Sequence, residues 1–209
     1  MPEGEERLPA WVLLQRARER VYTLPPDFPG FRARVAFFRR GVWHWGYAVV
    51  QGFTPRVELL EDVRNEVERE LASLLGHRRP VPFPEGEGRY PMRLVEEGPL
   101  GTVIALEDPY RSRIWVRQGR LSLIERHLPE GSFRIHLEDW TVVEAERLLP
   151  HRFLVVRRDE AGRIARVERY RDTYRRVGPY WVPQEREVVV EAEGTEGVVL
   201  RLEDMEVVA

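Results

Sequence analysis

The five histidines are the first candidates for chemistry, because an imidazole binds metals and transfers protons near neutral pH. They are His44, His77, His127, His136 and His151. Three of them on neighbouring strands could hold Zn²⁺ with a carboxylate such as Glu138, which shares a strand face with His136. No spacing matches a known ligand set, so we favour solvent-facing polar side chains and predict neither a metal nor a cofactor.

The sequence VWHWGY at residues 42–47 is the second candidate, because two tryptophans flank a histidine. In a strand, alternation puts Trp43, Trp45 and Tyr47 on one face and His44 on the other. Large aromatic side chains build cores, and they also line ligand pockets. We interpret this strand first as part of the core. If the concave face of the sheet also holds a ligand, the predicted binding residues are Trp43, Trp45, Tyr47, Trp115 and Trp140.

Arginine and tyrosine alternate in ERYRDTYRRVGPYW, residues 168–181. Guanidinium groups beside phenol rings could bind a phosphate, a carboxylate or stacked bases. We favour a ladder of cross-strand ion pairs on a solvated face, because the formal net charge of the protein is only −2.

Other catalytic patterns are absent from the sequence. It contains no cysteine, which excludes disulfides, thiol catalysis and cysteine-bound metals. It also has no glycine-rich phosphate loop and no serine in a nucleophile elbow. Carboxylates that are adjacent in sequence, such as Glu96 and Glu97, diverge in a strand and do not form an acid–base pair for glycoside hydrolysis. We therefore predict no catalytic residue and lean toward a protein that is not an enzyme.

Two helices are expected to support these residues. Apolar residues recur at roughly helical spacing in residues 8–22, and TLPPDFPG then ends the helix. Residues 62–75 form the clearest helix, with one apolar stripe made by Val63, Val67, Leu71 and Leu74. The Pro- and Gly-rich segment VPFPEGEGRYP that follows is either a lid or a simple crossing.

The rest of the chain is predicted to form β-strands. Residues 31–37 and 42–49 alternate around an RRG turn, and nine further strands are expected between residues 92 and 207. In one of them, Phe133, Ile135 and Leu137 alternate with polar residues, so one face of the sheet must be covered. Short turns between strands indicate antiparallel pairing. We predict a single α+β domain over residues 1–209, in which a long, strongly curved antiparallel sheet wraps around the two helices.

Composition limits the class of protein. Hydrophobic residues make up 43% and charged residues 33% of the 209 residues, which is typical of a soluble globular protein. The net charge gives no reason to expect a nucleic-acid partner, and no apolar run is long enough to span a membrane. The acidic start lacks signal-peptide features, so we predict a cytoplasmic protein. Scarce Asn and many ion-pairing charges suggest adaptation to heat.

The order of segments resembles the family catalogued as domain of unknown function 3386. The resemblance is carried by Y-T and FPGF before a strand hairpin, by a helix ending in HRR, and by HRFLVVRRDEAGRIARVERYRDTYRRVGPYWVP. It covers roughly residues 8–208 and implies no catalytic residues. The plan is also similar to the half-barrel of lipoprotein-carrier (LolA-like) proteins, in which a curved sheet and a helical lid enclose an apolar cavity.

Three functional hypotheses follow. The first is a binding protein that holds a hydrophobic or amphipathic small molecule in the concave face of its sheet. The second is a structural or protein-interaction module. The third, which we favour least, is a His/Glu-dependent enzyme, with or without a metal. The oligomeric state is not predicted.

Overall fold

A computed structural model describes residues 8–59 and 61–208 of the chain. Its elements are α1 (Ala10–Glu19), β1 (Gly30–Arg39), β2 (Val42–Gln51), β3 (Thr54–Glu58), α2 (Glu61–Gly76), the 3-10 turns η1 (Phe83–Glu85) and η2 (Glu87–Arg89), β4 (Met92–Gly98), β5 (Gly101–Leu106), β6 (Arg113–Arg117), β7 (Arg120–Leu128), β8 (Gly131–Val142), η3 (Glu144–Glu146), β9 (Leu148–Arg158), β10 (Ile164–Val177), β11 (Tyr180–Glu191) and β12 (Thr195–Val207).

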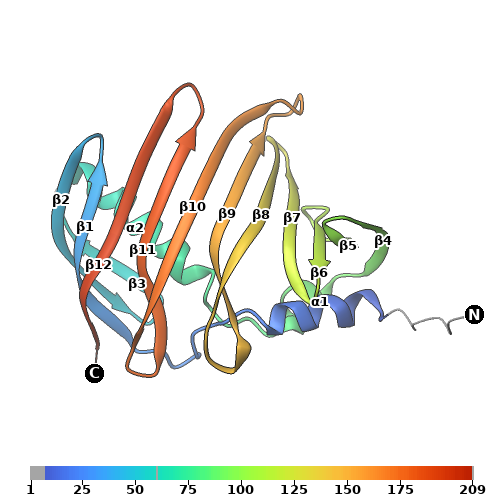
Figure 1. The fold of residues 1–209 in the computed structure, drawn as a ribbon, viewed down its shortest axis with the longest axis horizontal. Helices are drawn as coiled ribbons and strands as arrows, with labels where there is room; N and C mark the ends of the chain where they lie inside the picture. Colours follow the sequence, from blue (N-terminus) through green and yellow to red (C-terminus); the bar gives the residue numbers. More distant parts are fainter. Residues whose placement is uncertain (1–7, 60, 209) are drawn as a thin grey trace, which may run out of the picture.

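The strands form one 12-stranded sheet in the order β3-β2-β1-β12-β11-β10-β9-β8-β7-β6-β5-β4 (Figure 1). All neighbouring strands are antiparallel. From β4 to β12 each strand pairs with the next one in sequence, and β1 then pairs with β12. The predicted α+β class, with a curved antiparallel sheet and two helices, is confirmed. That residues 1–209 form one domain stays a prediction.

Helix α2 covers one half of the sheet. Its predicted stripe of Val63, Val67, Leu71 and Leu74 is buried, and it belongs to the same core cluster as Phe31 and Phe37 of β1. Full burial of such a side chain contributes roughly 1.5–3 kcal/mol of stability. We call the sheet face against which the helices pack the inner face, and the opposite face the outer face.

Helix α1 covers the other end of the sheet and is shorter than the predicted 8–22. Its buried residues are Ala10, Leu14 and Ala17, which pack in a second core cluster with Ile104 and Ile114. Their spacing of four and three residues puts them on one helix face, and the small alanines let the helix approach the sheet closely. Trp11 of the same helix is 53% exposed.

Nine of the strands, β4–β12, match the predicted segments, but β3 was missed. This five-residue strand contains Pro55, and Val57 is its one buried residue, so its alternation is too short to recognise. Strand β3 leads into α2 and so places the helix over the sheet.

Candidate functional site

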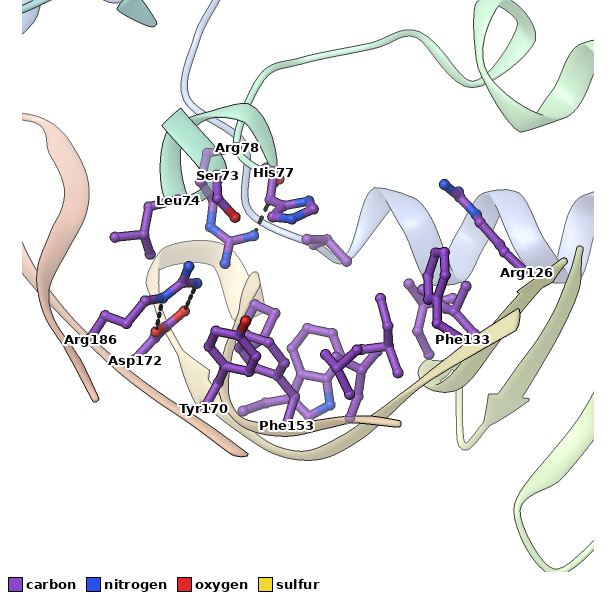
Figure 2. A pocket seen from close by; sticks show the side chains of 18 of the residues that line it. Ser73, Leu74, His77, Arg78, Arg126, Phe133, Phe153, Tyr170, Asp172 and Arg186 are labelled. Atoms are coloured by element: carbon purple, nitrogen blue, oxygen red, sulfur yellow. Dashed lines mark hydrogen bonds and ion pairs between the residues drawn. The ribbon is translucent and has the colours of Figure 1, made fainter. Parts of the chain in front are cut away.

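A cavity of about 380 Å³ lies between the two core clusters. It is bounded by β7–β11, by the last turn of α2 and by the end of α1 (Figure 2). Several of its lining residues, including Phe133, Phe153 and Tyr170, belong to neither core cluster and are only partly buried. The helices therefore leave the inner face of the middle strands partly uncovered.

The floor of this cavity follows the alternation seen in the sequence. Phe133, Ile135 and Leu137 point inward from β8, as predicted. The register then shifts on either side of Asp139, and Trp140 also lines the cavity. Without this irregularity Trp140 would point outward with His136 and Glu138. The Trp140 backbone N–H donates a hydrogen bond of 2.8 Å to Asp139 Oδ1.

Two stacked rings continue the floor. Phe153 of β9 and Tyr170 of β10 are direct cross-strand partners, with ring centroids 4.6 Å apart and an interplanar angle of 6°. Burial, together with the charges of Glu168 and Glu70, raises the pKa of Tyr170 to about 12. We call the set Phe133, Ile135, Leu137, Trp140, Phe153 and Tyr170 the inner aromatic floor.

A buried ion pair supports one end of the floor. Arg186 donates two hydrogen bonds, of 2.8 and 2.7 Å, to the carboxylate of Asp172, and a third of 3.1 Å to Glu70 of α2. Burial alone would lower the pKa of Arg186, but its hydrogen bonds and charge contacts with Asp172 and Glu70 raise it. The guanidinium also lies 5.0 Å from the Tyr170 ring centroid.

The prediction of a solvated ion-pair ladder in residues 168–181 is therefore only half right. Arg169 and Arg171 do form exposed pairs with Glu191 and Glu187 on the outer face. Tyr170 and Asp172, which alternate with them, point inward, and Asp172 is 0% exposed. The prediction overlooked that alternate residues of one strand lie in different environments.

Polar side chains gather at the edge of the cavity. Ser73, His77 and Arg78 come from the C-terminal end of α2, and Arg126 comes from β7 (Figure 2). Loss of hydration, with the charges of Arg78 and Arg186, lowers the pKa of His77, so its imidazole is mostly neutral at pH 7. The segment predicted as a lid or a crossing supplies Glu87, which pairs with Arg18.

The sequence placed the aromatic triplet of β2 on the apolar, concave face, but the structure places it on the outer face. Trp43, Trp45 and Tyr47 are 39%, 55% and 62% exposed, and none of them lines the cavity. Gly46 and Ala48 occupy the inner face instead. A Cβ at Gly46 would overlap the Glu58 carbonyl oxygen, so only a small residue fits beneath the β3–α2 connection. That the triplet binds a ligand stays a prediction.

The remaining predicted residues lie in different places. Trp140 is part of the inner aromatic floor, whereas Trp115 lies on the outer face of β6 between its cross-strand partners Val103 and Leu123. His44 faces inward, away from the tryptophans, as alternation predicted. His136 faces outward, where loss of hydration and the charge of Arg134 lower its pKa. Within residues 8–59 and 61–208, no group of three or more His, Asp or Glu side chains could hold a metal.

Sequence reasoning missed most of the cavity. Phe153, Tyr170, Arg78 and Arg186 were not proposed as ligand-binding residues, although the inward face of β8 was recognised. The available signal was the same alternation in β9 and β10, which puts Phe153 and Val155, and Tyr170 and Asp172, on one face.

Comparison with known proteins identifies a family. The model of the family described as "Protein of unknown function (DUF3386)" matches residues 5–205. A search of curated proteins finds no significant match. Within the described residues, no helix is long and apolar enough to cross a membrane.

Solved structures with a similar fold have low sequence identity. A domain from Vibrio parahaemolyticus described as an outer membrane lipoprotein-sorting protein is 9% identical over 94% of this chain and 91% of its own, with a TM-score of 0.40. A LolA superfamily protein from Nitrosomonas europaea is 11% identical over 97% and 95%, with a TM-score of 0.41. A DUF1329 family protein from Desulfovibrio piger is 8% identical over 95% and 91%, with a TM-score of 0.41. These likenesses concern the fold alone.

The cytoplasmic location predicted from the sequence does not stand. The prediction depended on the acidic start of the sequence, which lies in residues 1–7, outside the described residues. It was also an argument from a missing leader, and a missing leader in a given sequence does not identify a compartment.

Proposed function

We propose that this chain, which belongs to the DUF3386 family of proteins of unknown function, binds a hydrophobic or amphipathic small molecule in the cavity above its inner aromatic floor. One observation carries the proposal: the inward side chains of β8–β10 are apolar and aromatic, and the helices leave them only partly covered. A bound apolar molecule would remove this surface from water, at roughly 25 cal/mol per Å² of apolar area.

The size and lining of the cavity fit this function. Small-molecule sites have volumes of about 300–1,000 Å³ and combine an apolar lining with a few polar groups. The cavity here has a volume of about 380 Å³, with an apolar floor and with Arg78, His77 and Arg126 at its edge. Because the volume is near the lower end of that range, it suits one short chain or one compact ring system.

Native mass spectrometry of protein purified from its own host, before and after organic extraction, tests this proposal. We expect an apolar molecule to accompany the protein and to be lost on extraction. Extracted protein should then bind a short-chain amphiphile again with a stoichiometry of one. If the purified protein has a clean apo mass and the extracted protein binds no amphiphile, the proposal is wrong.

Protein interaction is a second candidate function, favoured by the exposed side chains of β1 and β2. The exposed Trp43, Trp45 and Tyr47, with the partly buried Phe38, form what we call the outer aromatic surface, in which the Trp43 and Trp45 ring centroids lie 6.1 Å apart. Arg201 and Arg34 lie over these tryptophan rings, each with its guanidinium carbon 5.5 Å from a ring centroid. Exposed aromatic and arginine side chains are typical of binding hot spots. Self-association that Trp45→Glu abolishes, measured by analytical ultracentrifugation, would support this function.

A further inference from the structure

Arg78 is buried but incompletely paired. It is 5% exposed and lines the cavity. Its terminal nitrogens donate hydrogen bonds of 2.8 Å to the Tyr174 hydroxyl and 3.3 Å to the His77 carbonyl oxygen. Its Nε is buried and has no hydrogen-bond partner. Figure 2 shows this side chain descending from the end of α2 toward Tyr170.

The other arginines of the cavity each have a carboxylate partner. Arg186 pairs with Asp172 and Glu70, Arg157 with Glu168, and both Arg18 and Arg126 with Glu87. No carboxylate among the described residues forms an ion pair with Arg78. Burying a cation without a counter-ion costs free energy, and an anion supplied by a ligand would reduce this cost at Arg78.

The charges around the cavity are also unbalanced. Five arginines line it and only four carboxylates pair with them, one of which, Glu168, is shared with Arg166, in a protein whose formal net charge is −2. Arg126 adds to the imbalance, because its ion pair with Glu87 is long, at 3.7 Å, and its Nε is also buried without a hydrogen-bond partner. The cavity is therefore a positively charged site within a slightly acidic protein.

We infer that the cavity selects an amphiphile with an anionic head group of the carboxylate class, which docks on Arg78 while its apolar chain lies along the inner aromatic floor. This inference rests on the proposed function and names the chemical class of its ligand. A guanidinium has five N–H donors, and the two terminal nitrogens of Arg78 each use one donor within the protein, so each keeps a second donor for one carboxylate. The cavity volume favours a single chain over a two-chain lipid.

The test compares two probes that share a chain and differ in the head group. Decanoate and 1-decanol, below their aggregation concentrations, are titrated calorimetrically into extracted protein. Hydrogen bonds to charged groups contribute enough for decanoate to bind at least about tenfold more tightly than 1-decanol. Arg78→Gln should remove this preference and leave the affinity for 1-decanol within about twofold. Arg78→Lys, which keeps the charge, should retain part of the preference.

Arg79→Gln is the matched control, because Arg79 is the exposed neighbour of Arg78, lies over the Phe53 ring and does not line the cavity. It should keep the full preference for decanoate. Circular dichroism and a thermal melt establish that each variant is folded. If Arg78→Gln does not fold, the preference is compared between Arg78→Lys and wild type at two salt concentrations.

The possible outcomes test the anionic head group and the ligand-binding cavity as two separate hypotheses. If wild type binds 1-decanol as tightly as decanoate, the anionic head group is wrong and the proposed function stands. If Arg78→Gln retains the preference, Arg78 is not the docking residue and the inference is overturned. If wild type binds neither probe, the proposed function fails and the inference fails with it.

Discussion

The inner aromatic floor and the outer aromatic surface contain similar side chains in opposite settings. The floor combines rings from three neighbouring strands, lies between two helix-covered cores and meets the buried charges of Arg186 and Arg78. The outer aromatic surface has its own tryptophan pair and its own cation–π contacts, but its tryptophans are 39% and 55% exposed. Composition alone does not separate the two, because coverage by the helices decides which one forms a cavity.

The difference shows that a small residue on one face of a strand can determine on which face the large side chains lie. On β2, the inner face has no room for a side chain at position 46 beneath the β3–α2 connection, and the larger aromatic side chains lie on the outer face. On β8–β10 the rings point inward and line a cavity of about 380 Å³.

Removing the buried carboxylate beneath the floor should have the largest effect. In Asp172→Asn the guanidinium of Arg186, which is 3% exposed, would lose its bidentate partner and keep only Glu70. Breaking a buried pair on one side costs about 3–5 kcal/mol. Urea denaturation should show a loss at the lower end of this range.

The matched variant for Asp172→Asn lies on the outer face. Glu203→Gln removes the closer of two carboxylate partners of Arg34, whose side chain is 46% exposed, and exposed pairs contribute at most about 1 kcal/mol. Equal losses in the two variants would contradict the distinction between a buried and a solvated ion pair.

Adding one methyl group under β2 should destabilise the protein next most. Gly46→Ala places a Cβ against the Glu58 carbonyl oxygen and the Leu59 side chain, and overpacking of this kind costs about 1–3 kcal/mol. Gly194→Ala is a control, because nothing lies within 4 Å of its added Cβ. Thermal melts of both variants measure the effect, and an unchanged melting temperature for Gly46→Ala would show that β2 can shift away from β3.

One tryptophan from each aromatic surface tests where the ligand lies. Trp140→Ala should weaken decanoate binding by about tenfold, because the indole supplies part of the apolar floor. Trp45→Ala should leave the affinity within about twofold, because Trp45 does not line the cavity. Calorimetric titration with decanoate measures both affinities. A lower affinity for Trp45→Ala than for Trp140→Ala would contradict a ligand site in the cavity.

The two histidines with lowered pKa values give the smallest predicted effect. His77 lies at the cavity edge and His136 on the outer face, and in both loss of hydration is the main cause. Because each native pKa lies below the unfolded value of about 6.5, the unfolded state binds more protons as the pH falls below it. Protonation of these histidines therefore favours the unfolded state. The protein keeps its full stability above about pH 6.5 and loses part of it as the pH falls further.

Urea midpoints at pH 7 and pH 5 measure this dependence on pH. His77→Gln and His136→Gln should each lose less stability than wild type between these values. Asp139 and Asp159, whose pKa values are lowered by hydrogen bonds from backbone N–H groups, respond only at more acidic pH. A wild-type midpoint that does not change between pH 7 and pH 5 would exclude the histidine contribution.

The sequence predicted the elements better than the site. Alternation and turns located β4–β12, and apolar spacing located α2, because these signals are local. The placement of Trp43 and Trp45 depends on the contact between Gly46 and the carbonyl oxygen of Glu58, twelve residues away. The burial of Asp172 depends on Arg186 from the next strand and on Glu70 from α2. Contacts between residues far apart in the sequence determine which face of a strand is the inner one. The alternation within a single strand cannot predict such contacts.

The most direct test of the central claim is a crystal structure of the protein with 10-bromodecanoate, in which anomalous scattering locates the bromine. We expect one bromine site in the cavity, against the inner aromatic floor, with the carboxylate within hydrogen-bonding distance of Arg78. A bromine site on Trp43 and Trp45 with an empty cavity would contradict it.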